Sequence, residues 1–202
     1  MNYLNQFMTV VYNKDFILDN IKEVVEQATS FHFIEAKEWY PKAHDECKNY
    51  SQNYDIDFQV VAGICSSLSP LKGWHQNLIL TKDFLKGKRW GHFTKQIKKA
   101  EKLLTLDNIK SLDTQIETIK FVLGGNKTIN FFQHIYNPMD NTAMVIDTHM
   151  LNICYGGMIK SVTNKQYDFL KNILIEQAKL CNLASSEYQS LLWLMMKYVK
   201  KK

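Results

Sequence analysis

Apolar residues recur every three to four positions along most of the chain, and this spacing predicts amphipathic helices rather than strands. Few residues break the pattern, since the 202 residues include only eight glycines and three prolines. We therefore expect an all-α fold of about nine or ten helices, without internal repeats. The expected helices cover roughly residues 15–28, 30–50, 57–69, 74–84, 94–104, 114–122, 129–136, 147–154, 165–181 and 185–199.

Individual residues mark where these helices begin, bend and end. Asp15 and Asp57 are expected as N-caps, because a carboxylate accepts hydrogen bonds from the first free backbone N–H groups. Pro41 falls inside the second helix, so a kink or break is expected there. The run after Asp57, FQVVAGICSSLSP, is nearly all apolar, which predicts a central, buried helix. Residues 1–12 are mildly apolar and suit a short helix.

The most informative stretch is LGGNKTINFFQHIYNPMDNTAMVIDTHMLNICYGG, residues 123–157. A Gly124-Gly125 turn leads into an apolar helical run that Asn137-Pro138 ends. After a linker, Asp147 lies where a buried apolar approach meets the first turn of a new helix. A carboxylate in that position is stabilised by the helix dipole, so it can stay ionised and face a ligand.

These residues resemble the helix-hairpin-helix DNA glycosylase superfamily, in which a glycine-containing hairpin precedes Lys-Thr and an Asp-x-His begins a later helix. The matching residues are Gly125, Lys127-Thr128 and Asp147-Thr148-His149. The family usually has Gly-x-Gly before the lysine, whereas Leu123 stands at the first glycine's position here. The backbone contact with a DNA phosphate can therefore differ. The resemblance covers about half of the chain, residues 58–157.

The resemblance also implies an architecture. It implies a two-lobed helical bundle that contains a helix-hairpin-helix element and an inter-lobe cleft. One lobe would comprise residues 56–140, with the hairpin at 123–128, and the other residues 1–55 and 141–202. The chain would then be a single compact unit of two lobes.

The resemblance implies that Asp147 is the catalytic carboxylate and that Lys127 occupies the position of the lysine nucleophile of bifunctional members. Base excision develops positive charge on the sugar, which a carboxylate stabilises. A cation is unfavourable in the first turn of a helix, so Lys127 suits either a phosphate contact or a Schiff-base role. On spacing alone, an ordinary N-cap is the simpler interpretation of Asp147. For Lys127 the alternative is a solvated lysine in the first turn of a helix.

Further candidates fall into two groups. Backbone N–H groups at a helix start and a lysine-rich helix face suit phosphates, although such a face is commonly just solvated. The DNA-binding candidates are Gly124, Gly125, Asn126, Thr128, Lys72, Lys98 and Lys99. A flipped base must be held against aromatic or amide groups. The base-pocket or wedge candidates are Leu71, Trp74, His75, Asn77, His134 and His149, with core packing as the alternative for Trp74.

Composition and charge limit which ligands and cofactors the protein is expected to bind. A net charge of +5 and a pI of about 8.9 permit a polyanion such as DNA without requiring one. The four cysteines form no C-x-x-C pair, so neither a zinc site nor an iron–sulfur cluster is expected, and we predict no metal and no cofactor. Without a signal peptide or a membrane-length apolar run, a soluble, cytoplasmic protein is expected. We expect it to be a monomer.

The sequence therefore predicts a DNA glycosylase that flips and excises a damaged or modified base, with or without abasic-site lyase activity. The residues do not identify the base, and they leave open both DNA repair and action on modified phage DNA. The alternative is a non-catalytic helical DNA-binding or protein-interaction module that kept the hairpin.

Overall fold

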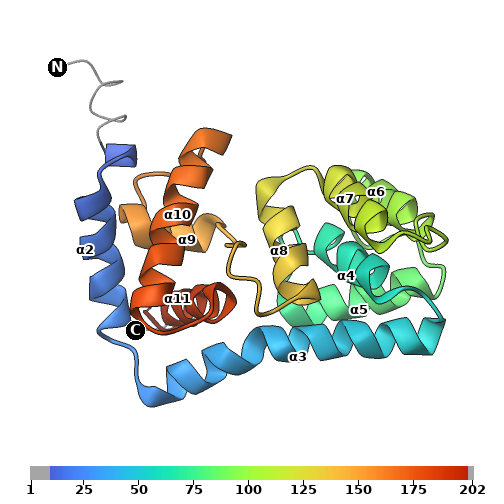
Figure 1. Ribbon diagram of the computed structural model, residues 1–202, viewed down its shortest axis with the longest axis horizontal. Helices are drawn as coiled ribbons and strands as arrows, with labels where there is room; N and C mark the ends of the chain where they lie inside the picture. The colour runs from blue at the N-terminus through green and yellow to red at the C-terminus, as the bar shows by residue number, and fades with distance from the viewer. Residues whose placement is uncertain (1–9, 200–202) are drawn as a thin grey trace. The chain divides into compact units, whose positions relative to one another are not determined.

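The computed structural model describes residues 10–199, and within this range all regular secondary structure is helical, which confirms the predicted all-α fold. The expected helix of residues 1–12 falls largely outside the described residues. The helices, labelled in Figure 1, are α2 (Lys14–Val25), α3 (Ser30–Tyr54), α4 (Phe58–Ser67), α5 (Trp74–Leu85), α6 (Thr94–Leu104), α7 (Leu112–Leu123), α8 (Asn126–Tyr136), α9 (Thr148–Tyr155), α10 (Asn164–Leu180) and α11 (Ser185–Val199).

The chain divides into two compact units. Unit 1 comprises Met1–Tyr40 and Met139–Lys202, and unit 2 comprises Pro41–Pro138. The division within the N-terminal part falls inside α3, because this helix continues from Ser30 to Tyr54 with Pro41 in its interior. The break expected at Pro41 is therefore absent. Proline removes one backbone donor from the helix, and the turns on either side keep their own hydrogen bonds.

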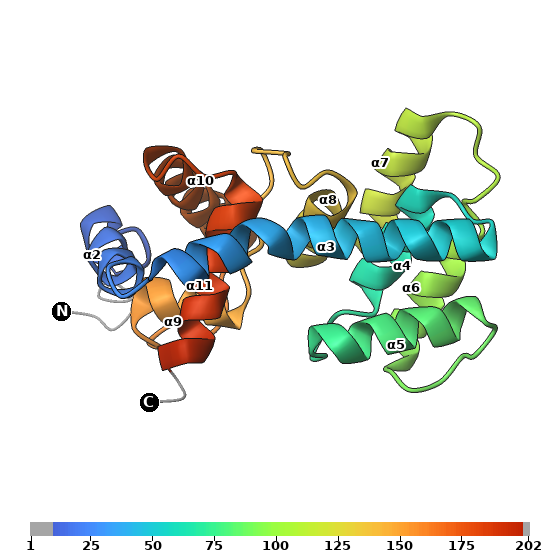
Figure 2. The same ribbon diagram turned by 90° about the horizontal axis from the view of Figure 1, so that it is seen from below.

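Helix α4 lies at the centre of unit 2, as its apolar sequence predicts. It contacts α5, α6, α7 and α8 (Figures 1 and 2). Every residue from Val60 to Ser67 is buried. Gly63 permits the close approach of a neighbouring helix, since a Cβ atom there would lie 3.0 Å from Cγ2 of Ile119 on α7. The hydrophobic burial of α4 on all sides thus determines where the surrounding helices pack.

Two N-terminal caps differ from the expectation. Helix α2 begins at Lys14, and the side chain of Asn13, not Asp15, accepts the hydrogen bond from the Phe16 N–H group at 3.0 Å. Asp57 precedes α4 but makes no side-chain cap bond. Its carboxylate instead accepts a hydrogen bond from Nε2 of Gln115 at 2.8 Å. Asp57 therefore ties the start of α4 to α7.

Unit 1 has a core of its own. Helix α9 packs against α2 and α11, and α11 also contacts α2 and α10. The core includes Met150 and Tyr155 of α9, Leu170 and Leu174 of α10, and Leu191 of α11. The first described residues join this core, because the Tyr155 hydroxyl donates to the Val11 carbonyl at 3.1 Å. This packing holds the start of α9, and with it Asp147, in a defined position.

Shortening a buried side chain of α4 tests whether this helix is central to the stability of unit 2. Ile64 on α4 is completely buried, so Ile64→Ala should lower the free energy of unfolding by about 2–5 kcal/mol through lost burial and cavity formation. Urea unfolding followed by circular dichroism measures the change. The matched control is Ile79→Ala on α5, where the side chain is 45% exposed. An equal loss for both variants would contradict the central role of α4.

Candidate functional site

The predicted hairpin is a tight turn between α7 and α8. Gly124 ends α7 in the left-handed conformation, with φ 66°, and its N–H group donates to the Lys120 carbonyl at 3.0 Å. A side chain at this φ would be strained, which explains the glycine. Gly125 is the N-cap of α8 and has no side chain to cap the helix. The turn therefore brings backbone N–H groups to the surface at the start of α8, the arrangement that binds anions.

Lys127 lies in the first turn of α8 and is half-buried. Its ammonium group makes no ion pair with the described residues. Phe131 follows one turn later on the same helix face. The Phe131 ring meets Trp74 of α5 edge-on, with centroids 6.4 Å apart. Unit 2 thus brings Trp74 to the helix face that carries Lys127, and Phe131 is a neighbour that the sequence interpretation missed although its i+4 spacing could have indicated it.

The loop between α4 and α5 carries an unusual leucine. Leu71 has a φ of 59°, and its side chain is 85% exposed. The left-handed conformation costs a leucine about 1–2 kcal/mol, and an apolar side chain gains nothing from water. Strain and exposure at one residue are typical of functional positions. His75 is also exposed near this loop, in the first turn of α5.

Two candidates for the base pocket or wedge are buried, which excludes them as the wedge. Asn77 is 1% exposed, and its Nδ2 lies 3.3 Å from the Cys65 sulfur, so it belongs to the interior of unit 2. His134 on α8 has no exposed surface. A wedge must reach the DNA from an exposed position, and neither side chain does so. The helical spacing of each residue did not distinguish the buried face of its helix from the exposed face.

Asp147 occupies the predicted junction between a buried approach and a helix. It is the N-cap of α9, and its Oδ1 atom accepts hydrogen bonds from the N–H groups of His149 and Met150 at 2.8 and 3.0 Å. The approach is held by Tyr167 of α10, whose hydroxyl donates to the Met144 carbonyl at 2.9 Å and accepts from the Ile146 N–H group at 3.1 Å. Hydrogen bonds before and after Asp147 in the chain thus hold its carboxylate in place.

The surroundings of Asp147 leave part of its carboxylate available. Its Oδ2 atom accepts no hydrogen bond from the described residues. The buried Tyr40 hydroxyl donates to Oε1 of Gln189 at 2.8 Å, and burial followed by the charge of Asp147 raises the pKa of Tyr40. His149 next to it has a buried Nδ1 atom without a hydrogen-bond partner among the described residues. One oxygen is therefore fixed by the helix while the other can meet a cationic group.

Among the basic candidates, the α6 lysines lie near the turn, also within unit 2. The Lys99 ammonium on α6 donates to the Leu123 carbonyl, directly before the two glycines, and Lys98 precedes it on the same helix. Thr128 stabilises the turn by donating to the Gly125 carbonyl at 2.9 Å. Lys72 lies in the Leu71 loop and is half-buried. The hairpin and the lysine face of α6 therefore form one continuous region.

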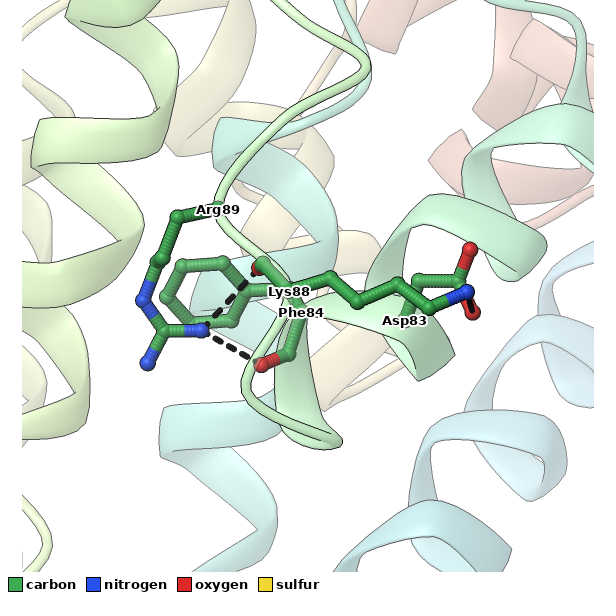
Figure 3. A network of polar contacts seen from close by, with 4 residues as sticks. All are labelled: Asp83, Phe84, Lys88 and Arg89. Carbon is green, nitrogen blue, oxygen red and sulfur yellow. Dashed lines mark hydrogen bonds and ion pairs between the residues drawn. The ribbon is translucent and has the colours of Figure 1, made fainter.

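A second basic turn, between α5 and α6, is engaged internally. Figure 3 shows that Arg89 lies over the ring of Phe84. Its guanidinium carbon is 4.0 Å from the ring centroid. Arg89 Nη1 also donates to the Phe84 and Lys88 carbonyls at 2.7 and 3.1 Å. The Lys88 ammonium lies 2.9 Å from the Asp83 carboxylate. These cations stabilise their own turn, which leaves them poorly placed to bind an external anion.

The predicted catalytic pair is divided between the two units, with Lys127 in unit 2 and Asp147 in unit 1.

Within the described residues no helix is long and apolar enough to cross a membrane. The same residues contain no group of three or more His, Cys, Asp and Glu that could hold a metal ion. The four cysteines are free thiols, of which Cys181 is exposed.

The fold and these residues define an all-helical protein of two units, with a Gly124-Gly125 turn between two helices in one and a capping carboxylate in the other. The chain belongs to DUF7178, a family of unknown function whose model matches residues 7–200. Comparisons with curated proteins and with solved structures gave no significant match.

Substitution of Asp147 separates its capping role from any other role. Asp147→Ala removes the acceptor for two N–H groups and should cost about 0.5–2 kcal/mol of stability, whereas Asp147→Asn keeps an acceptor oxygen and should cost only a few tenths. Thermal and urea unfolding measure both changes. Thr163→Ala, which removes the cap of α10, is the matched control. A loss for Asp147→Asn as large as for Asp147→Ala would show that the charge itself maintains the fold.

Proposed function

We propose that the protein is a DNA glycosylase of the helix-hairpin-helix type, which excises a damaged or modified base. The observation that carries the proposal is Lys127, a half-buried lysine without an ion-pair partner among the described residues, in the first turn of the hairpin helix. A cation there is unfavourable in the protein alone, so a negatively charged ligand would compensate for it. A DNA phosphate supplies that charge, and an emptied sugar supplies a carbon for attack by the amine.

The hairpin and α6 would hold the DNA backbone. Backbone N–H groups after Gly125 suit a single phosphate at the start of α8. Lys98 and Lys99 would neutralise phosphates next to it, because they adjoin the turn. These contacts are independent of sequence, as a search for rare bases in a long duplex requires.

Leu71 is the wedge in this proposal. A base that is to be excised must leave the stack, and an inserted apolar side chain fills the space that it vacates. Leu71 is exposed and lies three residues before Trp74, which with Phe131 supplies aromatic surface for a base. The strained backbone at Leu71 holds the side chain away from the protein surface.

Asp147 would stabilise the sugar as the glycosidic bond breaks. The departing base takes the bonding electrons, and positive charge develops between C1′ and the ring oxygen of the sugar. An oxygen of Asp147 that accepts no protein hydrogen bond can approach this charge while the other is fixed by the start of α9. The attacking group is either water, which yields an abasic site, or Lys127, which yields an imine and then strand cleavage. The proposal requires both units to reach the same nucleotide.

The rival proposal is a DNA-binding module without catalysis. It is favoured by one observation, namely that the hairpin and the α6 lysines all lie in unit 2. Binding of a backbone by unit 2 needs nothing from Asp147 in unit 1. A measurement of base release distinguishes the two proposals, since both predict salt-dependent DNA binding.

The first test screens the purified protein against duplex DNA that carries a panel of damaged and modified bases. Wild-type protein should release one of them. Asp147→Asn should reduce that release by at least about a hundredfold, because the sugar cation loses its counter-charge. Lys127→Gln should abolish release and borohydride trapping if the lysine attacks, and retain release if water attacks. Single-turnover assays measure each rate.

Controls make both outcomes interpretable. Thr163→Ala loses a cap far along the chain and should excise at the wild-type rate at a temperature where it is folded. Lys165→Gln removes a lysine of unit 1 and should leave trapping unchanged. Wild-type rates for Asp147→Asn would refute the role of the carboxylate, and no release of any base together with tight DNA binding would favour the rival.

The wedge assignment has a separate test. Leu71→Ala should slow excision from duplex DNA by about tenfold and leave excision from a single strand unchanged, because only the duplex requires a base to be unstacked from its partner. Leu180→Ala on α10 is the matched control, since that leucine is 79% exposed and lies in unit 1. An equal loss on both substrates would contradict the wedge.

A further inference from the structure

Helices α6 and α7 of unit 2 pack side by side (Figure 1). An open groove runs between them. Its volume is about 520 Å³, and neither Lys127 nor Asp147 lines it. Four lysines of α6 and two residues of α7 form most of its surface. They are Lys95, Lys98, Lys99, Lys102, Phe121 and Val122. The groove ends at the hairpin, where a Cβ atom on Gly124 would lie 3.9 Å from the Lys99 ammonium nitrogen.

The positive charge of the groove is not balanced by the protein. No carboxylate lines it, and none of its lysines forms an ion pair within the described residues. The one glutamate of α6, Glu101, lies 3.4 Å from Arg89 instead. Burial and then the nearby charge of Lys95 lower the pKa of Lys99. Cations held together without counter-ions favour the binding of an external polyanion.

The groove also contains an exposed aromatic ring. Phe121, near the end of α7, is 78% exposed, whereas the adjacent Val122 is 7% exposed. The Lys102 ammonium lies 5.7 Å from the Phe121 ring centroid. On its other side the ring borders a depression lined by Asp113 and Glu117. The ring therefore separates a basic side, which suits phosphates, from an acidic side, which does not.

An exposed ring beside unpaired lysines matches the chemistry of single-stranded nucleic acid. Each nucleotide of a single strand offers one base face for stacking and one phosphate for a cation. The bases of a duplex are already stacked and paired, so they cannot reach a ring on the protein surface without opening. An acidic peptide would satisfy the lysines and leave the aromatic ring unused.

We propose that the groove between α6 and α7 binds single-stranded DNA, with one base stacked on Phe121 and flanking phosphates on Lys95, Lys98 and Lys102. The choice of DNA rests on the proposed function, while the binding itself requires neither Lys127 nor Asp147. Because the groove leads to the hairpin, the strand that it binds would lie beside the duplex backbone contacted there. The protein would thus bind an unpaired strand next to a duplex, as at a gap, an end or an opened site.

Fluorescence anisotropy tests the groove directly. The probe is a labelled oligothymidine of about six nucleotides, and the reference is an oligomer of the same length built from abasic nucleotides. Wild-type protein should bind the oligothymidine about tenfold more tightly than the abasic oligomer. Phe121→Ala should remove this difference, because the abasic oligomer has no base to stack, while Phe121→Trp should keep or increase it.

The salt dependence of binding tests the role of the groove lysines. Lys98→Gln should reduce the slope of log affinity against log salt concentration by about 0.7, the value for one phosphate contact on a single strand. Phe31→Ala and Lys179→Gln are the matched controls. Both residues are exposed and lie in unit 1, so both variants should bind like wild type.

Three results would overturn the inference. They are equal affinity for the two oligomers, unchanged binding by Phe121→Ala, and competition by a polyglutamate peptide of equal charge as effective as by oligothymidine. Tighter binding of oligouridine than of oligothymidine would overturn the assignment to DNA. Base release does not enter these measurements. A protein that binds the oligothymidine through Phe121 but excises nothing would refute the glycosylase proposal alone.

Discussion

The close packing around α4 is the constraint on which unit 2 depends. This helix is apolar on every face, so its burial requires neighbours on all sides, and α5, α6, α7 and α8 supply them. Gly63 lets α7 approach closely, because a side chain there would press against Ile119. Once α6 and α7 are packed on the same helix, the lysines of one lie beside the end of the other. The basic region at the hairpin is thus a consequence of the core.

The two candidate catalytic residues represent opposite uses of a helix N-terminus. Asp147 satisfies the backbone donors of α9, which stabilises the helix and fixes the carboxylate at the same time. Lys127 opposes the dipole of α8 and has no ion-pair partner within the described residues. The cap that Asp147 provides is sufficient to explain its presence. Lys127 contributes no such stabilisation, so a ligand is needed to explain it. Lys127 is therefore the stronger indication of function. For Asp147, the capping role must be distinguished experimentally from a catalytic role.

The surface of unit 2 carries apolar side chains where folding does not require them. Leu71 and Phe121 are 85% and 78% exposed, and Leu71 also has a left-handed backbone. Exposed apolar groups next to lysines are suited to nucleic acid, whose bases stack and whose phosphates are negative. By contrast, Arg89 and Lys88 look equally basic in the sequence but are used within their own turn. Charge alone therefore does not indicate where a polyanion binds.

Periodicity determined the helical content and most helix bounds, since the 3.6-residue repeat is a local property of the chain. It also determined that Asp147 begins a helix and that Gly124-Gly125 ends one, because caps obey local rules. It failed at Asp15, since Asn13 caps α2, and at Pro41 it did not decide between a kink and a break, of which the break is absent because α3 continues through the proline. In both cases two local signals competed, and propensity alone does not rank them.

Only the tertiary structure decided which face of each helix is buried. Asn77 and His134 were predicted to face a base, but packing against other helices places them inside. Packing likewise brought Trp74 to Phe131 and Lys99 to the hairpin, contacts between residues far apart in the chain. The amino-acid pattern specifies what each helix must bury, whereas the partner that covers it depends on how all the helices fill one volume.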